Sequence, residues 1–140
     1  MNALLKLVIA FGSTLVAFAV LDGVWLTVMS SRLYKPALGP LLADKANLGA
    51  AVPFYLIYLG GLVYFAVWPA LHSGRWQTAL LNGAVLGLVA YATYDLTNQA
   101  TLRIWSTKVT ILDMAWGAFA SALAATISYA ITAWANRAIG

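Results

Sequence analysis

Three aspartates stand inside stretches that are otherwise apolar, and they are the residues of this sequence best suited to chemistry. They are Asp22, Asp95 and Asp113, whereas the fourth acid, Asp44, lies in a polar stretch. A carboxyl group can serve as a general acid, a general base or an oxygen ligand for a hard cation. Inside a membrane such a group costs about 2.5–3.5 kcal/mol on insertion scales, so it indicates a functional site by default. We assign any catalytic role to these three carboxyls.

Several other chemistries lack their residues. The chain has no Cys, and its one histidine, His72, lies in a short polar stretch. A Ser-His-Asp triad, a thiolate site and a His-ligated metal are therefore not indicated. A hard divalent cation such as Mg²⁺ on the aspartates stays open as a cofactor, but an Arg or a single proton would suit the same carboxyls equally well.

The composition excludes a water-soluble fold. Of 140 residues, 63% are hydrophobic and only 9% are charged, where a soluble domain carries roughly 25% charged residues. The net charge of +4 comes from basic residues that are scattered rather than clustered. This pattern favours an anionic lipid surface as the partner, and no nucleic acid is expected.

Four apolar stretches reach the roughly 20 residues that cross a bilayer. They cover residues 4–28, 48–71, 78–97 and 109–134. We predict an all-α membrane protein in which residues 1–140 form one integral membrane domain, a four-transmembrane-helix antiparallel bundle. The first stretch is too long for a signal peptide and lacks a small-x-small cleavage site, so we predict a retained helix.

The connections between these stretches differ in character. Residues 29–47 contain two prolines and a glycine and predict a long loop with a short interfacial segment. Residues 72–77 predict a tight turn, and residues 98–108 an amphipathic segment along the membrane surface. One side of the membrane then holds five basic residues and the other three: Arg32, Lys35, Lys45, Arg103 and Lys108 against Lys6, Arg75 and Arg137. The positive-inside rule places both termini outside.

Antiparallel threading brings the three aspartates to one membrane face. Asp22 and Asp95 lie near the ends of the first and third spans, and Asp113 lies near the start of the fourth. Small residues follow the same helix faces as the last two acids, beginning with Gly83 and Gly87. Because small residues mark helix–helix contacts in membranes, these faces should point into the bundle.

Eight further residues form the expected ligand-binding shell of the carboxyls. Each lies at a similar depth or shares a helical face with one of the aspartates, and one supplies a nearby cation. They are Trp25, Tyr55, Tyr58, Tyr91, Tyr94, Asn98, Arg103 and Trp116. Trp25 and Trp116 each follow an aspartate by three residues, a match too short to establish an internal repeat.

Three functions fit the three aspartates and their expected shell. The first is a binding or enzymatic site for a lipid-like or amphipathic molecule at the membrane interface. The second is a small proton- or ion-coupled transporter, which we expect to be dimeric. The third is a non-catalytic scaffold subunit. The far halves of the helices carry hydroxyl and amide groups but no acid. A transporter needs polar groups reachable from both faces, so the pattern favours the first function. Membrane lipid is the expected partner, and a homodimer stays open.

The segment "YDLTNQATLRIWSTKVTILDMAWG", with "LDGVWL" in the first span, carries a family resemblance. The matching positions are Tyr94, Asp95, Thr97, Asn98, Ala100, Thr101, Trp105, Asp113, Trp116 and Gly117. With them the chain resembles DUF2177, a family of short bacterial four-helix membrane proteins. The resemblance implies a multi-pass protein of the bacterial inner membrane. It implies no activity, so the roles given above come from the residues alone.

Overall fold

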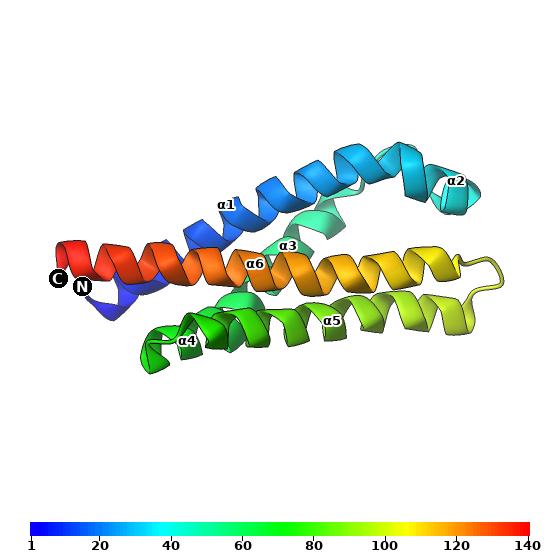
Figure 1. The fold of residues 1–140 in the computed structure, drawn as a ribbon. Helices are drawn as coiled ribbons and strands as arrows, with labels where there is room; N and C mark the ends of the chain where they lie inside the picture. Colours follow the sequence, from blue (N-terminus) through cyan, green and yellow to red (C-terminus); the bar gives the residue numbers. More distant parts are fainter.

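Four long helical segments run antiparallel in the computed structural model of this chain, which describes all residues from 1 to 140 (Figure 1). The elements in chain order are α1 (Ala3–Met29), η1 (Ser30–Tyr34), α2 (Lys35–Leu38), η2 (Gly39–Leu41), α3 (Leu48–Leu62), η3 (Val63–Val67), α4 (Trp68–Ser73), α5 (Trp76–Thr101) and α6 (Thr107–Ile139). They form four continuous helical segments, each long and apolar enough to cross a membrane. The prediction of an all-α four-helix membrane protein is confirmed.

The first helical segment is longer than the sequence predicts. After α1 the chain passes through the π-helical turn η1 into α2 and the 3-10 turn η2, so helical structure continues to Leu41. The prediction of a loop beginning at residue 29 is therefore wrong. Pro36 does not stop the helix because it stands in the first turn of α2, where a residue without an N–H is tolerated.

The connection between α5 and α6 is shorter than predicted. Helix α5 continues to Thr101 and α6 begins at Thr107, so the amphipathic surface segment expected over residues 98–108 does not form. Ser106 caps α6, because its side chain accepts a hydrogen bond from Val109 N at 3.3 Å. Side-chain acceptors at this position satisfy a backbone donor that has no partner within the helix.

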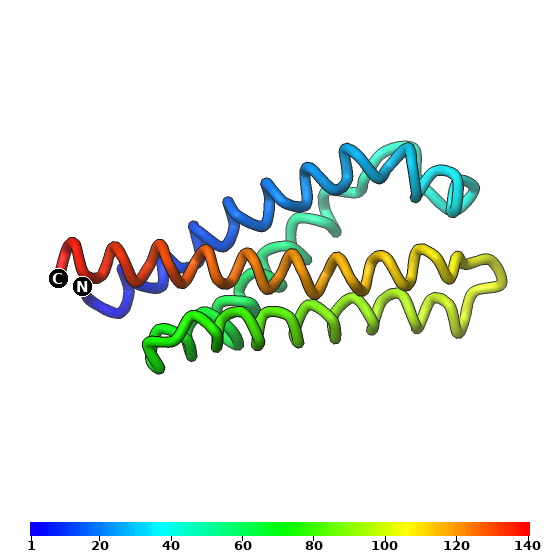
Figure 2. The backbone as a smooth tube through the Cα atoms, viewed as in Figure 1, coloured from blue at the N-terminus to red at the C-terminus, as the bar shows by residue number.

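The segments are not evenly spaced. Helices α5 and α6 lie side by side over their length, whereas α1 diverges from α6, so that the C-terminal end of α1 lies farther from it (Figure 2). Both chain termini lie at one end of the bundle, and α2 and the connection after α5 lie at the other. Near the termini α1 and α6 are tied together, because Ser128 Oγ donates to Ala10 O at 2.9 Å and accepts from Ser13 Oγ at 3.0 Å.

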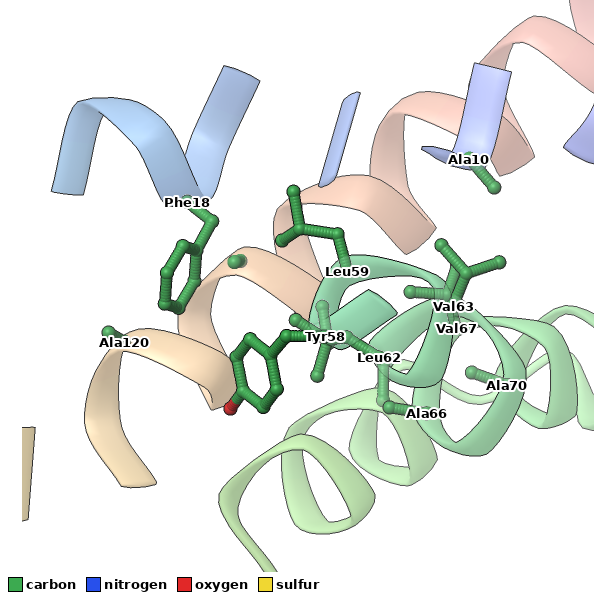
Figure 3. Packing of buried hydrophobic residues seen from close by; sticks show 13 residues of the cluster. Ala10, Phe18, Tyr58, Leu59, Leu62, Val63, Ala66, Val67, Ala70 and Ala120 are labelled. Carbon is green, nitrogen blue, oxygen red and sulfur yellow. The ribbon is translucent and has the colours of Figure 1, made fainter. Parts of the chain in front are cut away.

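The apolar core fills the middle of the bundle between α1, the α3–α4 segment and α6. Phe18 and Ala120 approach from α1 and α6, and Tyr58, Leu59 and Leu62 from α3 (Figure 3). Leu59 and Leu62 are completely buried, and Phe18 is almost so. The cluster continues towards the termini through Ala10, Val63, Ala66, Val67 and Ala70.

Helix α5 is anchored to the π-helical turn η3. Asn82 Nδ2 on α5 donates to Phe65 O, within η3, at 2.9 Å. A π turn interrupts the regular i to i−4 hydrogen bonds and exposes a carbonyl group to other donors. The second segment is thus held to α5 at η3 by a polar bond as well as by packing.

Glycines allow α5 and α6 to touch through their backbones. A Cβ atom at Gly87 would overlap the carbonyl oxygen of Gly117, and one at Gly83 would lie 2.7 Å from Ser121 O. A Cβ at Gly117 would overlap the ring of Tyr91. The predicted small-residue contact between these helices is therefore present, and it leaves no room for even a methyl group.

This contact gives a test of the fold. Replacing Gly87→Ala should lower the free energy of unfolding by about 1–3 kcal/mol, because the added methyl group must push the helices apart. Gly12→Ala in α1 meets nothing within 4 Å, so it should be neutral or stabilise by up to about 1 kcal/mol. Thermal unfolding in detergent, followed by circular dichroism, measures both. Equal melting temperatures for the two variants would contradict the packing.

Candidate functional site

The structure buries all three predicted aspartates. Asp95 on α5 is completely buried, and Asp22 on α1 and Asp113 on α6 are each 7% exposed. They lie on the bundle side away from the termini, as antiparallel threading predicts. Asp95 and Asp113 form a pair, while Asp22 lies apart from them on the same side of the bundle. No three such side chains lie close enough to form a metal-ligand group, so the structure gives no support to a hard cation held by all three.

The carboxyl groups of Asp95 and Asp113 are within hydrogen-bonding reach of each other. Such a bond needs a proton on one of them, because an ionised carboxylate only accepts. No N–H or hydroxyl group of the protein donates to either oxygen of Asp95. A buried carboxyl group without a donor is unusual and demands a partner.

The α5–α6 contact explains why these two side chains meet. Gly87 faces Gly117, and Asp95 stands about two turns beyond Gly87 while Asp113 stands about one turn before Gly117. In an antiparallel pair the two Cα atoms are then offset along the axis by about one turn, roughly 6 Å. Cα–Cβ bonds tilt towards the N-terminus of their own helix. In this arrangement the tilt carries both carboxyl groups towards each other.

A chain of polar contacts joins Asp113 to the first helical segment. Tyr34 in η1 donates its hydroxyl hydrogen to Asp113 Oδ1 at 2.5 Å, and Trp25 Nε1 donates to the Tyr34 oxygen at 2.8 Å. The indole of Trp25 stacks on that of Trp116, with ring centroids 4.5 Å apart and planes 8° from parallel. The two tryptophans that each follow an aspartate by three residues, one on α1 and one on α6, thus form one stacked pair.

Tyr34 is the functional residue that sequence reasoning missed. It lies in the stretch predicted as a loop, and its contact depends on the helix continuing through η1. The sequence offered no clear signal for this contact, because Pro36, Gly39 and Pro40 are typical of a loop.

Asp22 is held by the second helical segment. It accepts a hydrogen bond from the Tyr55 hydroxyl, and one turn further along α3 the Tyr58 hydroxyl shares a 2.5 Å hydrogen bond with Ser121 Oγ. Tyr58 packs edge-on against Tyr91, with centroids 6.5 Å apart. Aromatic rings and hydroxyls therefore line the space between Asp22 and the carboxyl pair.

A slot between α3 and α5 leads to the carboxyl pair. It is a cavity of about 350 Å³ lined by Phe54, Ala90, Tyr91, Tyr94 and Asp113. Helix α5 packs against η3 and α4 but has few contacts with α3, so the two segments diverge here. Phe54 and Tyr94 are 55% and 60% exposed. The slot thus opens sideways from the bundle, and its apolar walls end at a carboxyl group.

Two predicted residues do not reach the aspartates. Arg103 is exposed in the connection after α5 and forms no ion pair, so it is not the nearby cation that we expected beside the carboxyls. Helix α5 extends past the predicted end, which moves Arg103 beyond the level of the pair. Asn98 is half-buried and does not donate to Asp95.

The sequence comparison adds a family to this geometry. Residues 7–130 match the model of DUF2177, a family described as predicted membrane proteins. This chain belongs to the DUF2177 family. No curated protein and no solved structure matches it. The four membrane spans agree with the family description, which assigns no activity to the carboxyl pair.

The bond from Tyr34 to Asp113 can be tested by a single atom change. Tyr34→Phe removes the donor to Asp113 and the acceptor of Trp25, so the free energy of unfolding should fall by about 1–2 kcal/mol. Tyr64→Phe is the matched control, because Tyr64 is 70% exposed and forms no side-chain hydrogen bond. The control should change stability by less than about 0.5 kcal/mol. Unfolding of both proteins in the same detergent gives the comparison, and an unchanged Tyr34→Phe protein would disprove the bond.

Proposed function

We propose that this DUF2177 protein binds a lipid-like, amphipathic molecule with its polar end at the Asp95–Asp113 pair. The apolar part of the molecule lies in the slot between α3 and α5. One observation carries the proposal: Asp113 ends a slot that opens sideways, and behind it lies Asp95, a completely buried carboxyl group that accepts from no N–H or hydroxyl group of the protein. A ligand that donates a hydrogen bond, such as a hydroxyl or an amine, supplies what Asp95 lacks.

The energetic gain on binding arises at Asp95. Leaving a buried polar group unpaired costs about 1–3 kcal/mol, and more when the group is charged. The proton shared with Asp113 relieves part of this cost and leaves acceptor positions free. A donor that arrives with an apolar tail restores the missing bonds while the tail covers the slot walls. The Trp116 indole N–H is also buried and unpartnered, and it offers a donor on the same face of α6.

The same pair is suited to acid–base chemistry on the bound molecule. Two carboxyls that hold one proton can both give and accept a proton without a change of residue. Binding is the primary proposal, and an enzymatic step would use Asp113, which reaches the slot directly. Asp95 would then act as the partner that holds or returns the proton.

Two observations favour this function over the alternatives. The completely buried side chains of Leu59, Leu62 and Ala124 lie between the carboxyl pair and the far end of the bundle, which disfavours a transport path in this conformation. A purely structural role predicts carboxyls that are fully bonded within the protein. Asp95 is not, and the exposed Arg103 leaves it without a cation.

Lipid retention tests the proposal. The protein is extracted in copolymer nanodiscs, delipidated by washing, and its bound molecules are quantified by mass spectrometry. Asp113→Asn removes the carboxyl from the slot and Ala90→Trp fills the slot, so each should reduce one retained species about tenfold, equal to about 1.4 kcal/mol. Asp44→Asn, a carboxyl change outside the slot, should retain it fully.

Two results would count against the proposal. A retained species unaffected by either slot variant lies elsewhere, so the slot would not be its site. Unfolding of both Asp95→Asn and Asp113→Asn proteins would assign the pair a structural role, because each change keeps the size of the side chain. We expect both to melt within a few degrees of the unmodified protein.

A further inference from the structure

A second cavity lies at the opposite end of the bundle, beside the chain termini. Its volume is about 520 Å³, within the range of small-molecule sites. Residues from α1, α4, α5 and α6 line it, and apart from the Trp76 indole its polar side chains are basic, hydroxyl or amide in character: Lys6, Thr126, Tyr129, Thr132, Asn136 and Arg137. It shares no residue with the slot between α3 and α5.

This end of the bundle carries cations and no acidic side chain. Lys6 and Arg137 line the cavity, and Arg75 precedes α5 beside it. Asp22, Asp95 and Asp113 lie towards the other end, and Asp44 lies in the connection between the first two segments there. Like charges lining a low-dielectric cleft produce a field that attracts the opposite charge. The cavity is therefore suited to an anion.

One unpartnered hydroxyl group and the start of one helix belong to the wall of this cavity. Thr132 is completely buried, lines the cavity, and its Oγ1 forms no hydrogen bond. Helix α5 begins at Trp76 in the cavity wall, and no side chain caps its first turn. The first N–H groups of a helix have no partner within the helix and attract anions, phosphate above all.

We infer that this cavity binds a phosphate group, carried either by the headgroup of an anionic phospholipid or by a soluble phosphate compound. Lys6 and Arg137 supply the charge, and Thr132 supplies a hydroxyl donor within the cavity. Basic pockets between membrane helices bind phosphate headgroups by this combination. Phosphate binding in this cavity does not depend on the carboxyl site, because the two cavities share no residue.

The test uses delipidated full-length protein in a neutral detergent. Phosphatidylglycerol and phosphatidylcholine are added in separate titrations and bound lipid is counted by native mass spectrometry; inorganic phosphate is titrated by calorimetry. The variant Lys6→Gln/Arg137→Gln removes both cations of the cavity. Arg103→Gln/Lys108→Gln is the matched control, because it removes two positive charges from the other end of the bundle.

We expect phosphatidylglycerol to bind at least about tenfold more tightly than phosphatidylcholine, and this preference to vanish in the cavity variant but not in the control. Thr132→Val, which keeps both shape and charge, should weaken phosphatidylglycerol several-fold. The Thr132→Val variant alone tests the cavity if the double variant fails to fold. Phosphate binding with the same dependence identifies a soluble ligand, and binding of the lipid alone identifies a headgroup.

Three outcomes would overturn the inference. One is equal affinity for the two lipids together with no phosphate binding. Another is an equal loss in the cavity variant and the control, which would reflect net charge alone. The last is binding that Thr132→Val leaves unchanged. Asp113→Asn should not alter any of these titrations, so failure here is distinguishable from failure of the carboxyl site.

Discussion

The backbone contact between α5 and α6 is the constraint on which the carboxyl site depends. Because neither Gly87 nor Gly117 has a side chain, the two helices approach until their backbones touch. That contact fixes how far one helix can slide along the other, and so it fixes the level at which Asp95 and Asp113 face each other. A looser helix pair would let each carboxyl turn to a separate environment.

The bundle separates two kinds of electrostatic environment. Carboxyls gather on one side of the apolar core, and the other end has cations without acids. The core around Leu59 and Leu62 keeps them apart. Hydrogen-bond donors are unevenly distributed among the three aspartates. Asp22 accepts from Tyr55 and Asp113 accepts from Tyr34, whereas Asp95 accepts from neither. Asp95 is thus the one aspartate of the three that accepts no hydrogen bond from an N–H or hydroxyl group of the protein.

The sequence predicted the helices and the common side of the three aspartates because both follow from hydrophobic length and antiparallel threading, but only Asp95 and Asp113 meet, whereas Asp22 is bonded by Tyr55. It also predicted the inward faces of α5 and α6, since small residues recur along them. Tyr34 was missed because prolines and a glycine suggested a loop where the chain adopts π and 3-10 turns. Arg103 was placed too close, because the charge of a residue says nothing about where a helix ends. The lateral slot depends on the angle between α3 and α5, which local patterns do not encode.

The π-helical turn η3 decides which side of the second segment faces inward. Before it Tyr55 and Tyr58 reach Asp22 and Ser121, and within it Phe65 offers its carbonyl to α5. A π turn contains about one residue more than an α-helical turn. Deleting a single residue from Val63–Val67 would let this turn close as an ordinary α-helical turn with the flanking faces unchanged, and the distortion that exposes the Phe65 carbonyl would be lost. A regular α-helix over all five residues would instead rotate everything before it by about 100°. In this segment the number of residues is as strict a requirement as their identity.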